Sequence, residues 1–175
     1  MLKKIAKMLP RKTLVSLYRK LPLSIGVKRR IVYCANERFL VAVLGIIMND
    51  DRKVLLLKHT YRRAEPWGLP SGYIEKEDPN AGLQREIFEE TSFTVEIGQI
   101  IYTGYADNPP RINLYFSGRI TSGEFKSCEE ISECDFFDIK DLPGYMPNYE
   151  KELIRKVLNH DCPAANGYTD AGDKA

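Results

Sequence analysis

The sequence has few cysteines, and no two of them lie at metal-binding spacing. The four are scattered through the chain as Cys34, Cys128, Cys134 and Cys162. Because there is no CxxC pair and no Cys/His cluster, the sequence argues against a zinc site. Free or buried thiols are expected instead of disulfide bonds, as is usual in the reducing cytoplasm.

Long hydrophobic runs are also absent. The longest, Phe39 to Met48, has ten residues, about half of what a membrane-spanning helix needs. The basic start Lys3-Lys4 does not lead into a secretion signal, because Pro10-Arg11-Lys12 interrupts the apolar stretch that follows it. We therefore expect a soluble, cytoplasmic protein.

Acidic residues are nearly missing from the first part of the chain. Met1 to Arg38 contain eleven Lys or Arg and one acid, Glu37, a net charge of +10; the whole chain carries +2, which leaves −8 for the remainder. Apolar residues between Leu2 and Leu21 recur at helical spacing, which predicts two short amphipathic helices joined at Pro10. We favour packing of this stripe on the rest of the chain or on a second copy, as in a homodimer, over contact of residues 1–30 with nucleic acid or an anionic membrane.

The length suits one core with short extensions. We expect a basic helical extension over residues 1–35, one folded domain over 36–160 and a flexible tail over 161–175. The apolar runs 39–48 and 53–59 predict a β-hairpin around 49–52. A helix should begin after Asp78, a good N-cap followed by Pro79, and run to about Thr91. Further strands are expected over 94–105, 111–120 and 134–139, and a last helix over 149–159.

Three glutamates share one face of the helix expected after Asp78. Glu86, Glu89 and Glu90 stand three and four residues apart, so their like charges gather on one stripe. A hard cation such as Mg²⁺, with Mn²⁺ as an alternative, would relieve this repulsion through oxygen ligands. The alternative for an arbitrary triplet of this spacing is a solvated helix face.

The surrounding stretch from Leu69 to Phe93, LPSGYIEKEDPNAGLQREIFEETSF, resembles the Nudix box, G-x5-E-x7-R-E-U-x-E-E-x-G-U, in which U is aliphatic. Glu77 is followed at the family's spacing by Arg85-Glu86-Ile87 and by Glu89-Glu90. Two departures stand out: the loop between Gly72 and Glu77 has four residues instead of five, and Ser92-Phe93 replaces the closing glycine and aliphatic residue. The resemblance covers roughly residues 39–142.

This resemblance implies an α/β fold, the Nudix α/β/α sandwich around a mixed β-sheet. It implies that Glu86, Glu89 and Glu90, together with the main-chain carbonyl of Ser71, hold the metal ion. It also implies that Arg85 pairs with Glu77 and holds the helix against its loop.

The resemblance leaves the general base open. Some members of the family use a glutamate of the box, here Glu89. Others use one from a loop before a late strand, here Glu130 or Glu133, each of which is otherwise a solvated loop carboxylate. His59 is a poorer candidate, since a lone histidine at a strand end is more often structural.

Substrate contacts are expected from Gly72 and from the loop after residues 53–59. This loop combines aromatic faces with cations in Tyr61, Arg62, Arg63 and Trp67. Trp67 could equally be a packing anchor beneath the loop. Pro109 resembles the downstream proline of ADP-ribose pyrophosphatases within the family.

The expected function is metal-dependent hydrolysis of a diphosphate linkage in a small-molecule nucleotide, of the ADP-ribose or nucleotide-sugar type. One alternative is a MutT-like nucleoside triphosphate pyrophosphatase, and another is a nucleotide-sensing module without turnover. Because all four glutamates of the box are present, the sequence favours an enzyme.

Overall fold

A computed structural model describes residues 12, 16, 20 and 22–158. The chain separates into two units, Met1–Arg38 and Phe39–Ala175. In the first unit, helix α3 (Ile25–Ala35) is capped by Ser24, whose hydroxyl accepts a hydrogen bond from the Val27 N–H at 3.4 Å. The helices expected between Leu2 and Leu21 and the tail 161–175 lie outside the described residues, apart from positions 12, 16 and 20. No helix in the described part of the chain is long and apolar enough to cross a membrane.

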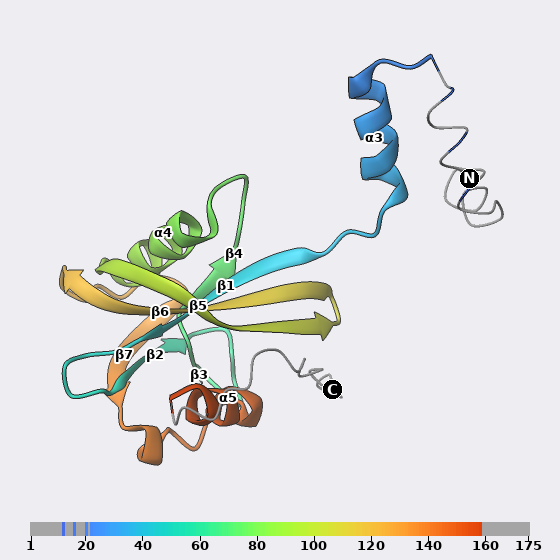
Figure 1. The fold of residues 1–175 in the computed structure, drawn as a ribbon. Coiled ribbons are helices and arrows are strands. Elements are labelled where there is room, and N and C mark those ends of the chain that lie inside the picture. The colour runs from blue at the N-terminus through green and yellow to red at the C-terminus, as the bar shows by residue number, and fades with distance from the viewer. Residues whose placement is uncertain (1–11, 13–15, 17–19, 21, 159–175) are drawn as a thin grey trace. The chain divides into compact units, whose positions relative to one another are not determined.

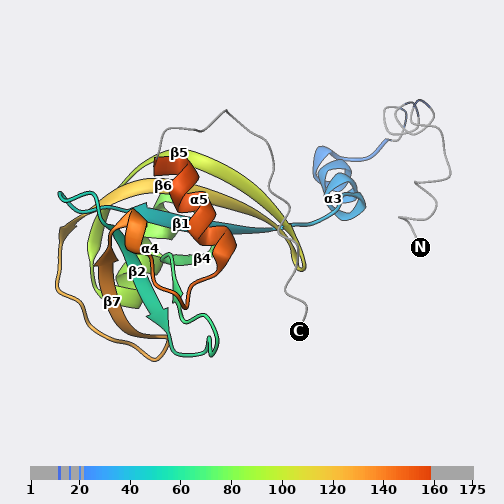
Figure 2. The ribbon, with the colours of Figure 1, turned by 90° about the horizontal axis from the view of Figure 1, so that it is seen from below.

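The described part of the second unit has four strands before helix α4 and three strands between α4 and helix α5 (Figure 1). In chain order its elements are β1 (Leu40–Ile47), β2 (Val54–His59), β3 (Trp67–Gly68), β4 (Ser71–Tyr73), α4 (Pro79–Thr91), β5 (Thr94–Asp107), β6 (Pro110–Ser122), β7 (Ile131–Phe137), the 3-10 helix η1 (Ile139–Asp141) and α5 (Asn148–Leu158). The strands lie between α4 on one side and α5 on the other, and α5 lies across them in the view from below (Figure 2). The expected α/β/α sandwich is confirmed.

The strands form two sheets, with orders β4-β1-β6-β5 and β3-β2-β7. The first sheet is mixed, because β1 runs parallel to β6 while its other pairs are antiparallel. The predicted hairpin of β1 and β2 is therefore wrong. The turn forms, with Asn49 N–H bonded to the Lys53 carbonyl at 3.1 Å, but beyond the single bridge Met48–Val54 the strands part into different sheets.

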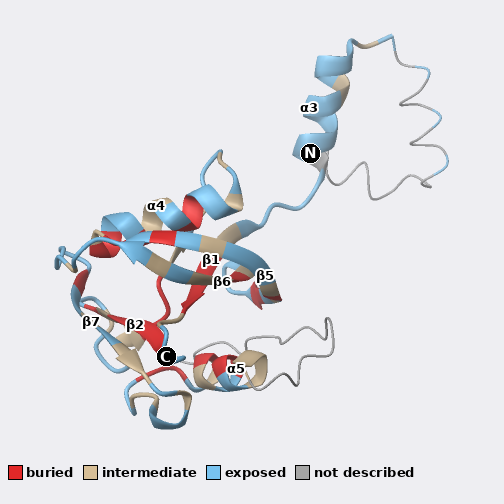
Figure 3. Cartoon of the chain, turned by 60° about the vertical axis from the view of Figure 1, so that its left-hand side comes forward, coloured by how far each residue is buried: buried red, intermediate tan, exposed pale blue. Residues whose placement is uncertain are grey.

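Strands β1 and β2 are each buried on both faces. Alternate residues of β1 and β2, namely Val43, Ile47, Leu55 and Leu57, pack with Leu83 and Ile87 of α4. The intervening residues Leu44, Ile46, Val54 and Leu56 pack with Leu153 and Ile154 of α5. Figure 3 shows this buried material along β1 and β2 and on both helices. Each strand is thus central to its own sheet, which accounts for its unbroken apolar sequence.

The later elements match the expected ones with shifted bounds. Strands β5 and β6, which were expected over 94–105 and 111–120, form a long antiparallel hairpin with register irregularities near Thr94 and around Ile100. The expected strand 134–139 begins earlier, at Ile131, and ends at Phe137, because it follows the pairing with β2. Helix α5 lies within one residue of its expected bounds.

Helix α4 has the expected beginning and an unusual end. The Asp78 side chain accepts the Asn80 N–H at 2.9 Å, and Pro79 occupies the first turn. At the other end Ser92 adopts the left-handed conformation, with φ 64° and ψ 15°. This is the position where the box has its closing glycine. A side chain there strains the backbone, which glycine would not.

Replacing Ser92 with Gly is expected to stabilise the protein by about 0.5–1 kcal/mol, because relief of the left-handed strain outweighs the extra freedom of glycine in the unfolded chain. The melting temperature should rise by about 1–4 °C. Ser92→Ala is the matched control, since it removes the hydroxyl but keeps the strained Cβ. Equal melting temperatures for the two variants would contradict this account.

Candidate active site

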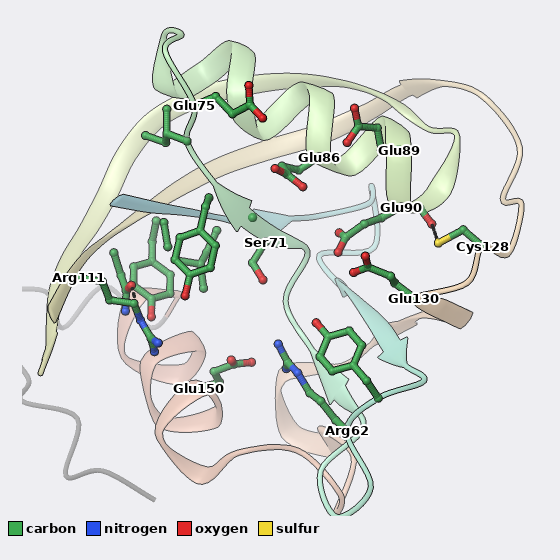
Figure 4. Close-up of a pocket in the computed structure, with 18 of the residues that line it drawn as sticks. Arg62, Ser71, Glu75, Glu86, Glu89, Glu90, Arg111, Cys128, Glu130 and Glu150 are labelled. Carbon is green, nitrogen blue, oxygen red and sulfur yellow. Dashed lines mark hydrogen bonds between the residues drawn. The ribbon is translucent and has the colours of Figure 1, made fainter. Parts of the chain in front are cut away.

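A cavity of about 810 Å³ lies between α4, the strand β4 before it, the loops after β2 and before β7, strand β6 and helix α5. Eight of the residues singled out from the sequence line it: Tyr61, Arg62, Ser71, Gly72, Glu86, Glu89, Glu90 and Glu130. In Figure 4 the glutamates of α4 project into the cavity from one side, and Arg62 and Glu150 lie on the opposite side. Residues far apart in the sequence therefore face one another across a single space.

Arg85 joins three carboxylates at the edge of this cavity. Its guanidinium donates to Glu77 through Nε at 3.3 Å and Nη2 at 2.9 Å, to Glu86 at 2.8 Å and to Glu89 at 3.0 Å. The pair between Arg85 and Glu77 is thus present despite the short loop before Glu77. The hydrogen bond from Arg85 lowers the pKa of Glu77. The hydrogen bonds to Glu77 and Glu86 raise the pKa of Arg85. Arg85 therefore fixes both the loop and the direction of two box glutamates.

Glu90 is the buried member of the box, with 8% of its surface exposed. Its Oε2 has no hydrogen-bond partner among the described residues. Burial first, and then the charge of Glu86, raises the pKa of Glu90 to about 8, although a backbone hydrogen bond from Ser71 opposes this rise. Burial also raises the pKa of Glu86. A buried carboxylate without compensation is costly, so this position calls for a cation.

The donor chemistry suits a hard divalent ion. Among residues 12, 16, 20 and 22–158, no three acidic, His or Cys side chains converge closely enough to hold one. The unpartnered buried oxygen of Glu90 and the nearby charges of Glu86 and Glu130 are nevertheless what a bound cation would compensate. The residues present therefore fit Mg²⁺ or Mn²⁺.

The two loop glutamates proposed as general base occupy different places. Glu130 lines the cavity, and its negative charge contributes to the raised pKa of Glu90. Two hydrogen bonds from Thr60 fix its loop: the Thr60 N–H donates to the Glu130 carbonyl at 2.8 Å, and the Thr60 hydroxyl donates to the Glu129 carbonyl at 2.7 Å. Glu133 lies on β7 outside the cavity and pairs with Lys58 at 2.7 Å.

The residues expected to bind substrate are also divided. Tyr61, Arg62 and Gly72 line the cavity, and Gly72 allows the Glu86 side chain to approach where a Cβ would collide with it. Arg63 is exposed and lies outside the cavity lining. Trp67 also lies outside the cavity lining. Its ring packs edge-on against that of Phe137, with the ring centroids 5.0 Å apart.

Comparison with known proteins decides the family. The family model described as the NUDIX domain matches residues 38–158. The chain belongs to the Nudix family. Members of this family are hydrolases that act on pyrophosphate bonds.

Among curated Nudix relatives, the ADP-ribose pyrophosphatase of Methanocaldococcus jannaschii is 34% identical over 121 residues, which cover 63% of this chain and 69% of the relative. A MutT-like protein of Streptomyces ambofaciens is 33% identical over 95 residues, covering 51% and 58% respectively. The crystal structure of a Nudix hydrolase from Nitrosomonas europaea superimposes with a TM-score of 0.64 at 22% identity, over 77% of this chain and 78% of that one.

A structure described as a UDP-X diphosphatase has a TM-score of 0.61 at 21% identity, and covers 91% of this chain and 81% of that one. At this level of identity the likeness shows the shared fold alone.

Sequence reasoning missed the far side of the Nudix cavity. Arg111, Asn113, Tyr149 and Glu150 line it from β6 and α5. A signal for Glu150 was present, because it occupies the same face of α5 as the buried Leu153 and Ile154. An acid within an apolar helix stripe is rarely left without a partner. No comparable signal marks Arg111 or Asn113, which are ordinary residues of an amphipathic strand.

Proposed function

We propose that this chain hydrolyses the diphosphate linkage of a nucleoside diphosphate joined to another moiety, such as ADP-ribose or a nucleotide sugar, with a divalent metal ion. The observation that carries the proposal is a single cavity with acidic and basic-aromatic sides. Glutamates of α4 line one side, the cations Arg62 and Arg111 lie on the other together with the buried Glu150, and several tyrosines belong to the lining. Such a cavity can hold a diphosphate at the first side through the metal and the rest of the substrate at the second.

The acidic side supplies the reaction chemistry. Glu86, Glu89, Glu90 and the main-chain carbonyl of Ser71 would hold Mg²⁺, which when bound neutralises phosphate charge and makes a water molecule more acidic. Glu130 lies beside this group and is the general base in this proposal, accepting the proton of the attacking water. Arg85 keeps Glu86 and Glu89 in place through its hydrogen bonds.

The opposite side supports a substrate larger than a phosphate group. Tyr61 has 60% of its surface exposed, and the Arg62 guanidinium lies over its ring, 5.8 Å from the centre, so an accessible aromatic ring and a cation stand together where a nucleobase or sugar could bind. The relative from Methanocaldococcus jannaschii is an ADP-ribose pyrophosphatase, which makes ADP-ribose the first substrate to test.

The test measures nucleotide and phosphate release with Mg²⁺ and with Mn²⁺ from ADP-ribose, nucleotide sugars, dinucleoside polyphosphates and nucleoside triphosphates. Glu89→Gln is assayed beside the wild type, since it keeps the shape of the side chain and removes the charge. Glu96→Gln is the control, because Glu96 is an exposed residue of β5 that pairs with Arg119 at 2.6 Å, away from the cavity lining.

We expect turnover of ADP-ribose or nucleotide sugars, lost in Glu89→Gln and retained in Glu96→Gln. Turnover of nucleoside triphosphates alone would instead establish the MutT-like alternative. Binding of nucleotides without turnover of any substrate would overturn the proposal in favour of a sensing module.

A further inference from the structure

Three side chains from separate elements converge on Gly68. A Cβ added at Gly68 would lie 2.5 Å from Arg62 Nη1, 3.4 Å from Glu150 Oε2 and 3.4 Å from His59 Nε2. The place that a side chain would occupy is therefore taken by the guanidinium of Arg62. Pairing of β3 with β2, which sets Gly68 opposite Leu57 and Trp67 opposite Lys58, holds the Gly68 backbone in this position.

Glu150 is buried and hydrogen-bonded beside Gly68. It is 3% exposed, its Oε2 accepts the Leu69 N–H at 3.3 Å, and its Oε1 accepts the Tyr149 hydroxyl at 3.0 Å. Burial raises the pKa of Glu150, and the positive charge of Arg62 is the largest influence opposing this rise. The positive charge of Arg62 thus acts on this buried carboxylate, and both side chains approach the same point at Gly68.

His59 forms a neutral wall on the remaining side. It is 2% exposed, and neither ring nitrogen has a hydrogen-bond partner among the described residues. Burial, and then the charge of Arg62, lowers the pKa of His59 to about 3. A neutral imidazole adds no second positive charge beside Arg62, and its ring limits the directions that the Arg62 side chain can take.

The free side of Arg62 faces the metal-binding glutamates. Arg62 is half-buried and lines the cavity, and its charge lowers the pKa of Glu90 across that space. Figure 4 shows Arg62 and Glu150 on the side of the cavity opposite Glu86 and Glu89. A phosphate group placed at the glutamates through a metal ion would therefore have a guanidinium on its other side.

We infer that Glu150 and Gly68 together position the Arg62 side chain so that its guanidinium points at a phosphate of the substrate. Arg62 binds the phosphate, and Glu150 and Gly68 are positioning residues that act through it. This inference rests on the proposed function, because it takes a diphosphate compound as the ligand. Glu150 belongs to α5, outside the box, and reaches the site only through the fold.

The test is a pair of double-mutant cycles that use inorganic pyrophosphate with Mg²⁺ as the probe and calorimetry of the full chain as the readout. Arg62→Ala and Glu150→Gln should each weaken binding by about tenfold or more, since each removes or misdirects a charge-assisted hydrogen bond. Gly68→Ala should weaken binding similarly, because its Cβ displaces the guanidinium without removing any charge. In the Arg62→Ala background, neither second substitution should weaken binding further.

Arg155→Ala is the matched control, since Arg155 is an exposed arginine on the same helix as Glu150 and lies outside the cavity lining. It should leave pyrophosphate binding unchanged. With a turned-over substrate, Glu150→Gln and Gly68→Ala should raise KM more than they lower kcat, and thermal denaturation should show all variants folded. If Glu150→Gln does not fold, the cycle with Gly68→Ala carries the test.

Equal losses from Glu150→Gln in the wild-type and Arg62→Ala backgrounds would overturn the inference, as would unchanged binding in Arg62→Ala. The readout is binding, so it separates two failures. Non-additive cycles in a protein that hydrolyses no substrate would support the positioning of Arg62 by Glu150 and Gly68 and contradict the proposed hydrolase function. Additive cycles in an active enzyme would support the hydrolase function and contradict this positioning.

Discussion

Glu130→Gln is expected to lower kcat by about 10²- to 10⁴-fold, the usual contribution of a general base. Glu130 lines the cavity and its charge acts on Glu90, whereas Glu133 lies outside the lining in an ion pair with Lys58. Glu133→Gln should therefore leave kcat close to that of the wild type. Steady-state kinetics on the best substrate, with saturating Mg²⁺, measures both values.

The pH profile separates a base from a merely nearby charge. In the wild type kcat should fall at low pH as the base becomes protonated, and this limb should be lost in the residual activity of Glu130→Gln. If Glu133→Gln shows the large loss and Glu130→Gln does not, the base has been assigned to the wrong residue. If neither variant loses activity, a glutamate of the box takes the role.

Glu90 should make the stability of the metal-free protein depend on pH. Its pKa is about 8 in the folded chain against 4.5 for an ordinary glutamate, so between these values the folded state binds more protons than the unfolded state. Its contribution to stability is then present at low pH and is lost as the pH rises from about 4.5 to about 8. Glu90→Gln removes this dependence. The free energy of unfolding of the variant, measured relative to that of the wild type, should therefore rise by on the order of 4 kcal/mol from pH 5 to pH 8.

Urea denaturation in EDTA at the two pH values measures this difference. Magnesium should oppose the loss of wild-type stability at high pH, because the ion binds the ionised carboxylate in the folded state only. At a concentration one hundred times its dissociation constant, Mg²⁺ would add about 2.7 kcal/mol to the wild type, more at pH 8 than at pH 5, and little to Glu90→Gln. A wild type and a variant with parallel pH profiles would show that Glu90 is ionised without cost, contrary to its burial.

The largest error of the sequence interpretation concerned β1 and β2. Their apolar runs and intervening turn are typical of a hairpin, and the turn exists, yet the strands belong to different sheets. An unbroken apolar run indicates burial on both faces but does not say which strand lies beside it. That choice follows from the parallel pairing of β1 with β6, which joins residues about seventy positions apart.

The substrate side was predicted only in part for a related reason. Tyr61 and Arg62 were predicted because the loop after β2 is rich in aromatic and basic residues. The same criterion also selected Arg63 and Trp67, which lie outside the cavity lining. Neighbours in an irregular loop point in directions that the sequence does not specify. Trp67 is instead part of the packing that holds β3, with its ring against Phe137.

By itself the sequence determined helix α4, its Asp78 cap, the shared face of its glutamates and the family to which the chain belongs. These are local properties, fixed by the 3.6-residue repeat of the helix and by spacings within about twenty-five residues. Only the tertiary structure decided that Glu130 lines the cavity while Glu133 does not, and that Arg62 and Glu150 both approach Gly68. Those contacts join segments far apart in the chain, and their geometry depends on how two cores pack on opposite faces of the sheets.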